Sequence, residues 1–142
     1  MKILVLLLIT LLTLNANVKR DKKREIVIDF TNKLVWQDSM DNLKMMLSQP
    51  DALEYCNELM HGGYGDWRIP EAEDYKTIVD KKNKPNHIHR SFRYVINEGY
   101  WAAKVHWRTM WTYADYMHFL SGTVYYDTKT KKKRVRCVRN LK

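Results

Sequence analysis

The spacing of apolar residues changes along the chain, and each change predicts a different element. Apolar residues first form the block ILVLLLITLLTL, residues 3–14. The stretch REIVIDF, residues 24–30, then has the pattern of a strand, and LVWQD, residues 34–38, forms a returning strand after the polar turn TNK. Two short strands joined by a polar turn predict a hairpin near the N-terminus.

A helical period begins near residue 48. Ser48 or Gln49 caps the predicted helix, and Pro50 suits its first position. The apolar residues that follow at helical spacing are Leu53, Cys56, Leu59 and Met60. We predict that Gly62 and Gly63 end this helix, because glycine readily adopts the left-handed conformation found at helix ends.

A second, shorter helix is predicted after Ile69. Pro70 suits its first turn, and the acidic residues that follow favour the positive end of the helix dipole. Its apolar face is formed by Tyr75, Ile78 and Val79.

Residues 81–99 have the composition of a loop, and short aromatic segments follow them. We predict strands in YWAAKV, MWTYAD, YMHFL, TVYYD and RVRCV, with turns at Ser121-Gly122 and Asp127-Thr128. A hairpin, two helices and then several strands predict an α+β fold, in which the helices are grouped beside a mostly antiparallel sheet.

The N-terminal block predicts an exported protein. Lys2 precedes the block and a small residue, Ala16, follows it, as in a signal peptide that is cleaved after Ala16. The block is shorter than the roughly 20 residues that span a bilayer, and an uncleaved anchor is the alternative. The predicted parts are a signal peptide, 1–16, a basic segment, 17–25, and a single domain, 26–140. The expected location is the periplasm or the cell exterior, associated with the envelope.

Composition adds a strongly basic balance, with a formal net charge of +9. In an exported protein, such a charge favours acidic or sulfated polysaccharide, lipopolysaccharide or anionic lipid over a specific nucleic acid. A solvated basic surface without a ligand is the alternative. One basic cluster follows the predicted cleavage site and comprises Lys19, Arg20, Lys22, Lys23 and Arg24. The candidate ligand-binding residues form two later clusters, namely Lys81, Lys82, Lys84, Arg90 and Arg93, and Lys129, Lys131, Lys132, Lys133 and Arg134.

The chain has two cysteines, Cys56 and Cys137. An even count in an exported protein favours a disulfide over two buried free thiols. His87 and His89 lie close in sequence, but two ligands are too few for a closed zinc site, which needs four. The prediction contains no catalytic residue, no metal and no cofactor.

Aromatic residues are frequent between positions 101 and 116. They are Trp101, Trp107, Trp111, Tyr113 and Tyr116. Most are expected to fill the core. Any that stay exposed near Lys104, His106 and Arg108 would form a platform for a sugar ring, with cations for its sulfate or carboxylate groups.

The stretch HGGYGDWRIPEAED, residues 61–74, looks like a binding site but has a structural use for each residue. Gly65 permits a sharp redirection, Trp67 supplies apolar area to the core, and Asp66 and Arg68 fix the corner through charge-assisted hydrogen bonds. We expect Arg136 to pair with Asp66.

Six blocks of the sequence occur in a characteristic order, namely KLVWQD, ALEYCNEL, GGYGDWRIP, YKTIVD, GYWAA and HFLSGTVYYDTKTKKKRVRCVR. Together they resemble the Lcl C-terminal domain family, a bacterial envelope domain, over about residues 26–139. The structural signature comprises Trp36, Gly62, Gly63, Asp66, Trp67, Arg68, Pro70, Trp101 and Arg136. The family often has YWSST where this chain has YWAAK, residues 100–104, so two hydroxyls are missing here.

The resemblance implies a fold similar to C-type lectins and to the formylglycine-generating enzyme. In such folds the first and last strands lie together, and two helices pack beside the sheet. The resemblance also implies a disulfide between the first helix and the last strand, at the positions of Cys56 and Cys137. The carboxylate-rich calcium loop of C-type lectins has no counterpart here, since KPN, residues 84–86, has a base in place of the acid.

These observations predict an exported, non-enzymatic binding protein for acidic or sulfated polysaccharide or another anionic envelope component. A collagen-like adhesin that carries a related domain is associated with binding sulfated glycans. The alternatives are a periplasmic structural or protein-interaction module, and an enzyme of unknown type. Contact with a membrane is expected only through an uncleaved signal or through surface charge. The sequence predicts no particular oligomeric state.

Overall fold

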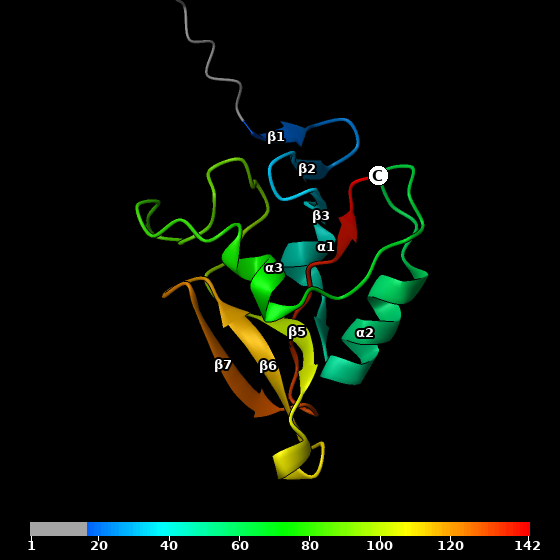
Figure 1. Cartoon of the computed structure of the whole chain (residues 1–142), viewed down its shortest axis with the longest axis vertical. Helices are drawn as coiled ribbons and strands as arrows, with labels where there is room; N and C mark the ends of the chain where they lie inside the picture. Colours follow the sequence, from blue (N-terminus) through cyan, green and yellow to red (C-terminus); the bar gives the residue numbers. More distant parts are fainter. Residues whose placement is uncertain (1–16) are drawn as a thin grey trace, which may run out of the picture.

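The computed structural model describes residues 17–142, so the predicted signal peptide, 1–16, lies outside the described residues. The described chain is α+β, as predicted, and consists mostly of strands with a few short helices (Figure 1). Two sheets share the core. One contains four strands in the order β1-β2-β3-β9, and the other contains five in the order β4-β8-β5-β6-β7.

The predicted hairpin forms the centre of the four-stranded sheet. Strands β2 (Ile26–Asp29) and β3 (Leu34–Gln37) pair antiparallel. The last strand, β9 (Val138–Asn140), pairs antiparallel with β3, so the C-terminus joins the N-terminal sheet as expected. Strand β1 (Val18–Asp21) pairs with β2 on the other edge. The sequence prediction had described this part only as a basic segment.

The first predicted helix is present but ends earlier than predicted, and two short elements that were not predicted precede it. A short helix α1 (Asp41–Lys44) and strand β4 (Met46–Leu47) precede α2 (Gln49–Glu58). The Ser48 side chain caps α2, and Pro50 lies in its first turn, as predicted. The helix ends at Glu58, however, because Leu59 already has an extended backbone.

The two glycines therefore lie in a separate turn and do not end the helix. Gly62 and Gly63 have φ values of 61° and 83° in a turn between His61 and Tyr64, whose backbones pair with each other. A Cβ on Gly62 would lie 2.9 Å from the Ile26 side chain. The positive φ and the close approach to β2 are the reasons why glycine is needed there.

Helix α3 (Ala72–Lys76) is also shorter than predicted. Its N-cap is Glu71, and the Glu71 and Asp74 side chains form a capping box. Pro70 therefore precedes the cap and does not belong to the first turn. The following residues, 77–98, contain no named element, in agreement with the predicted loop.

The C-terminal strands differ from the prediction in their division. Strand β5 (Gly99–Val105) is followed by a 3-10 turn, η1 (Trp107–Thr109), then by β6 (Tyr113–His118) and β7 (Thr123–Thr128). MWTYAD and YMHFL thus contribute to the single strand β6. RVRCV is divided between β8 (Lys133–Arg134) and β9, because the chain crosses from one sheet to the other at residues 135–137.

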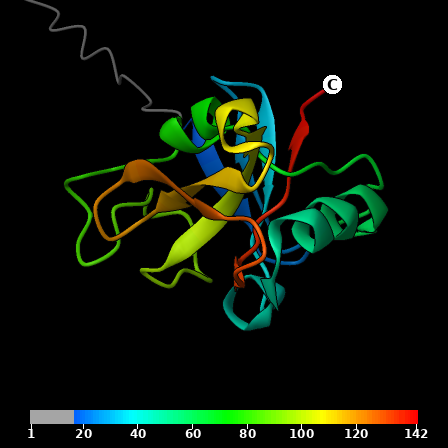
Figure 2. The same ribbon diagram turned by 90° about the horizontal axis from the view of Figure 1, so that it is seen from below.

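The disulfide between Cys56 and Cys137 joins α2 to this crossing segment. The S–S distance is 2.09 Å and the Cα–Cα distance is 5.5 Å. Both cysteines are fully buried in a core cluster with Ile26, Val35 and Trp101. Helix α2 lies on one side of this core and the β5–β7 strands lie on the other (Figure 2). The disulfide is confirmed, and the free-thiol alternative is wrong.

Candidate ligand-binding surface

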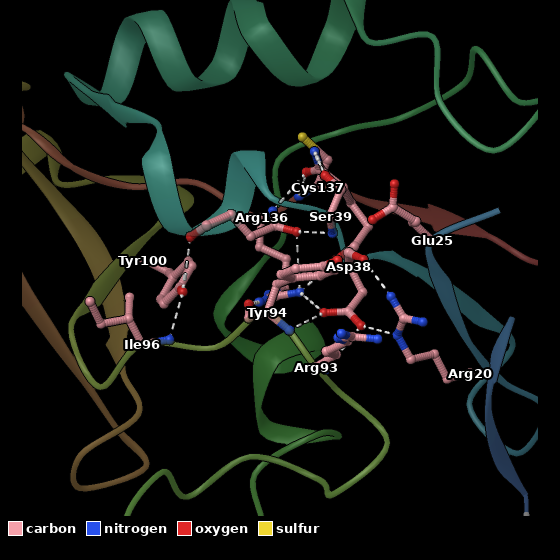
Figure 3. Close-up of polar contacts among 12 residues, drawn as sticks. Arg20, Glu25, Asp38, Ser39, Arg93, Tyr94, Ile96, Tyr100, Arg136 and Cys137 are labelled. Carbon is pink, nitrogen blue, oxygen red and sulfur yellow. Dashed lines mark hydrogen bonds and ion pairs between the residues drawn. The ribbon is translucent and has the colours of Figure 1, made fainter. Parts of the chain in front are cut away.

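A buried polar network surrounds the carboxylate of Asp38, directly after β3 (Figure 3). It is fully buried and accepts hydrogen bonds from Arg20 Nε at 2.6 Å and from the backbone N–H groups of Arg93 and Tyr94 at 2.9 and 3.0 Å. Arg136 Nη1 lies 3.3 Å from the same carboxylate. Burial would raise the pKa of Asp38, but the Arg136 charge and these hydrogen bonds outweigh it and lower the pKa.

This network is structural. Arg136 is itself fully buried and also donates to the Gln37 carbonyl at 2.6 Å and to the Tyr94 carbonyl. Its guanidinium lies over the rings of Phe92 and Tyr100. The carboxylate and guanidinium face protein groups on all sides, so the network connects β1, β3 and the 93–94 loop.

The expected pairing of Arg136 with Asp66 is therefore wrong. Arg139 takes that place, with Nε 2.6 Å from Asp66 Oδ1. Arg136 lies in the crossing segment before β9 and turns toward Asp38, whereas Arg139 lies within β9 and faces the 61–68 segment. The Arg139 hydrogen bond lowers the pKa of Asp66 to about 2.

The other signature residues also contact the protein itself. Trp67 is 3% exposed, and its indole N–H donates to the carbonyls of His61 and Tyr64 at 3.2 and 3.1 Å. Arg68 pairs with Asp74 at 2.6 Å. Trp36 and Trp101 are fully buried, and the Pro70 carbonyl accepts a hydrogen bond from the backbone of β5. The 61–74 stretch is thus held by intramolecular contacts.

The first predicted basic cluster lies on the long loop between α3 and β5. Its members Lys81, Lys82, Lys84, Arg90 and Arg93 are all exposed. Lys81 lines a depression of about 500 Å³ together with Val79 and Gly122. Gly122 is the residue directly before β7. Lys81 therefore lies near the start of β7.

The second predicted cluster lies beyond the other end of β7, and part of it is used internally. Lys131 and Lys133 both pair with Asp127 at 3.0 Å, and Lys133 lies 4.0 Å from the centre of the Tyr116 ring. Arg134 pairs with Glu98 at 2.8 Å. Lys129 and Lys132 have no ion pair among residues 17–142.

The two predicted clusters do not form one surface. A six-residue strand, β7, separates them, and at roughly 3.3 Å per residue step its ends lie about 17 Å apart. The second cluster instead meets the aromatic loop between β5 and β6. Lys129 N–H donates to the Thr112 carbonyl at 2.9 Å, which joins the lysine turn 129–132 to this loop.

We call this part of the molecule the η1 end, defined by Lys104, His106, Trp107, Arg108, Met110 and Trp111. It forms one tip of the long axis (Figure 1) and is nearest the viewer in Figure 2. Trp107, Met110 and Trp111 are 65%, 83% and 59% exposed, which is unusual for large apolar side chains in a small domain. Trp107 and Trp111 belong to the aromatic residues that were expected to form a platform if they stayed exposed, and Met110 lies between them in the turn.

The backbone holds these side chains outward in a fixed shape. Met110 and Trp111 both have positive φ, 55° and 63°, which is costly for non-glycine residues. The turn is stabilised by hydrogen bonds from both residues back to the Trp107 and His106 carbonyls, at 3.0 and 3.2 Å. Thr109 Oγ1 adds a bond to His106 O at 2.7 Å. These hydrogen bonds offset part of the backbone strain and hold the turn in this shape.

The base of the platform is held by a buried acid. His106 Nε2 lies 2.6 Å from Asp115 Oδ1, and the His106 ring packs 5.5 Å from Tyr126. Lys104, His106, Trp107 and Arg108 surround a depression of about 360 Å³. The Arg108 guanidinium lies 5.4 Å from the Trp107 ring. The η1 end therefore combines apolar ring faces with two cations, Lys104 and Arg108, that have no acidic partner in the described part of the chain.

Neither a metal centre nor a membrane span is found in the described part. Among residues 17–142, no three His, Cys, Asp or Glu side chains are grouped in a way that suits a metal ion. None of the helices in this range is both long and apolar enough to cross a bilayer.

Comparison with known proteins gives one match. Residues 25–139 match the family model described as Lcl C-terminal domain. No curated protein and no solved structure matches the chain.

Proposed function

We propose that this protein, which belongs to the Lcl C-terminal domain family, is an exported protein that binds acidic or sulfated polysaccharide at the η1 end. The observation that carries this proposal is the exposure of Trp107 and Trp111 on one hydrogen-bonded turn, with Lys104 and Arg108 beside Trp107. An indole ring packs against the apolar face of a sugar, and a guanidinium or ammonium group pairs with its sulfate or carboxylate.

The proposal assigns the polysaccharide to one end of the protein and not to its whole basic surface. The lysine turn 129–132 extends the η1 end and would contact further acidic groups along a chain. Lys133 and Arg134 form ion pairs with Asp127 and Glu98, respectively, and have a structural role. We also propose a C-type-lectin-like fold, which is supported by family membership and by the pairing of β9 with the N-terminal sheet.

The aromatic contribution sets the size of the expected effect. A sugar ring that covers about 80 Å² of one indole face contributes roughly 2 kcal/mol, at about 25 cal/mol per Å². Removal of one stacked indole should therefore weaken binding about 30-fold. Pure charge attraction to the domain would be insensitive to such a change.

Heparin chromatography and calorimetry with a sulfated oligosaccharide test the proposal. We expect Trp107→Ala and Trp111→Ala each to weaken binding strongly. The double substitution of Lys104 and Arg108 by Gln should weaken binding even more than either of them. The matched control replaces Lys81 and Lys82 by Gln, which removes the same charge from the other cluster. Equal loss in the control and in the Lys104/Arg108 variant would show that net charge, and not the η1 end, determines binding.

The proposed export has its own test. Mass spectrometry of the protein recovered outside the cytoplasm should give an N-terminus at Asn17. A full-length product retaining Met1 or Lys2 would support the uncleaved anchor instead. Capture of a defined envelope protein in high salt, without polysaccharide binding, would favour the interaction-module alternative.

A further inference from the structure

A second basic surface surrounds β1, at the opposite tip of the long axis from the η1 end (Figure 1). We call it the β1 face and define it by Lys19, Lys22, Lys23, Arg90, Arg93 and Phe30. All six side chains are exposed. None of its five cations is in an ion pair within residues 17–142.

Local structure brings two distant parts of the sequence together on this face. Ser91 Oγ donates to the Val18 carbonyl at 3.3 Å, which places the 90–93 loop beside β1. The guanidinium groups of Arg20 and Arg93 both lie 5.6 Å from the centre of the Tyr94 ring. The N-terminal basic segment and half of the first predicted ligand cluster therefore belong to one surface.

Two acidic residues next to this face, Asp29 and Asp38, are fully buried. Asp21 is partly exposed and lies among the lysines of the face, so it offsets one of the five positive charges. The Asp21 carboxylate accepts the backbone N–H groups of Lys23 and Arg24, both at 3.1 Å, and so shapes the turn that presents Lys22 and Lys23.

The β1 face also has an apolar element. Phe30 is 49% exposed at the end of β2. Lys19, Ile28 and Phe30 share a depression of about 470 Å³ with the lysines of the turn. In the antiparallel pair, Lys19 lies directly opposite Ile28. An exposed aromatic ring surrounded by lysines is the arrangement of proteins that lie at the boundary of lipid headgroups and acyl chains.

The order of the chain indicates what meets this face. Only NAN separates the apolar block 3–14 from Val18, the first residue of β1. Four residue steps span at most about 14 Å. Whenever the apolar block is in a bilayer, β1 therefore emerges within that distance of the block.

We propose that the β1 face docks on an anionic membrane surface, with its cations among lipid phosphates and Phe30 among the upper acyl chains. In this orientation the η1 end points away from the bilayer. The protein would then present its polysaccharide site outward from the membrane. Docking does not depend on the polysaccharide proposal, since the two surfaces share no residue.

Co-sedimentation with vesicles tests the docking. The protein that begins at Asn17, and so lacks the apolar block, is mixed with vesicles of phosphatidylcholine alone or of equimolar phosphatidylcholine and phosphatidylglycerol. We expect binding only to the anionic vesicles. Each Lys or Arg near such a surface strengthens binding about five-fold, so replacement of Lys19, Lys22 and Lys23 by Gln should weaken it about 100-fold.

The matched control replaces Lys104, Lys129 and Lys132 by Gln, which removes the same charge from the η1 end. It should retain vesicle binding. Arg90→Gln combined with Arg93→Gln provides a second test that leaves β1 and its turn unchanged, and Phe30→Ser tests the apolar contact. Thermal unfolding establishes that each variant is folded.

Three outcomes would overturn the proposal. They are equal binding to neutral and anionic vesicles, equal losses in the two triple-lysine variants, and loss of heparin binding without loss of vesicle binding when the β1 face is neutralised. The last result would make the β1 face a polysaccharide surface.

Discussion

The substitution Asp38→Asn should destabilise this protein more than the corresponding substitution of any other acidic residue described above. It preserves the size of the side chain but removes its charge. Arg20 and Arg136 then lose their shared anion. The amide nitrogen also replaces an oxygen that accepts a backbone N–H from Arg93 or Tyr94.

The expected loss follows from the burial of the pair. Both Asp38 and Arg136 have 0% side-chain exposure, and removal of one partner from a buried pair costs about 3–5 kcal/mol. A domain of this size has roughly 5–15 kcal/mol of stability. With a urea slope of about 2 kcal/mol per molar, the unfolding midpoint should fall by about 2 M.

Urea unfolding followed by tryptophan fluorescence measures this change, with the disulfide intact in both proteins. Asp66→Asn is the control, because Asp66 also pairs with an arginine but is 43% exposed, and its substitution should have a much smaller effect. The difference between Asp38→Asn and the natural protein should shrink as the pH falls below about 4, where Asp38 is protonated in the unfolded state. The lowered pKa of Asp38 means that its contribution is present above this pH and is lost with acidification. Equal midpoints for the two variants would refute the structural role of the network.

Three further predictions concern the scaffold. Trp67→Ala should cost about 3–5 kcal/mol in urea unfolding yet leave heparin binding intact, whereas a well-folded Trp67→Ala protein without heparin binding would place the site in the 61–74 stretch. Replacement of Cys56 and Cys137 by Ala removes a disulfide between residues 81 positions apart and should lower the free energy of unfolding by up to about 4.5 kcal/mol. An unchanged urea midpoint would contradict a stabilising role of the disulfide. NMR titration should find that Asp127 has a pKa of about 2, since the hydrogen bonds from Lys133 and Lys131 outweigh the effect of burial. Lys133→Gln should raise this pKa. The stabilisation from these pairs is present above about pH 4 and is lost as the pH falls toward 2.

Local sequence signals predicted the elements that depend on neighbouring residues. The hairpin of β2 and β3 and the start of α2 at Ser48 and Pro50 follow from strand, cap and turn preferences. The end of α2 did not follow, because Leu59 and Met60 continue the helical spacing. In the structure, Leu59 is extended and Met60 is 78% exposed, so the apparent apolar face ends before them.

Contacts between distant residues account for the main errors. Arg136 and Arg139 are similar in sequence context, and only the crossing between sheets determines that Arg136 reaches Asp38 while Arg139 reaches Asp66. The importance of Asp38 was not predicted, since its four partners come from positions 20, 93, 94 and 136. An acid at the end of the predicted strand LVWQD, in a strongly basic chain, was the available signal.

The candidate surface was predicted in parts. The aromatic segment and its neighbours Lys104, His106 and Arg108 were recognised as an optional platform, but their exposure depends on the positive-φ turn at Met110 and Trp111. The basic clusters were visible in the sequence, whereas contacts between distant residues decide where they lie. The Ser91–Val18 hydrogen bond brings the 90–93 loop to the β1 face, and the Lys129–Thr112 hydrogen bond brings the lysine turn to the η1 end. Charge alone therefore could not locate a site.

The most direct test of polysaccharide binding at the η1 end is the indole N–H spectrum of the protein during titration with a sulfated oligosaccharide. The chain has five tryptophans, of which Trp107 and Trp111 are exposed and Trp36, Trp67 and Trp101 are buried. We predict saturable shifts of the Trp107 and Trp111 signals, with the three buried signals nearly unchanged. Binding that leaves the Trp107 and Trp111 signals unmoved would contradict the proposed site.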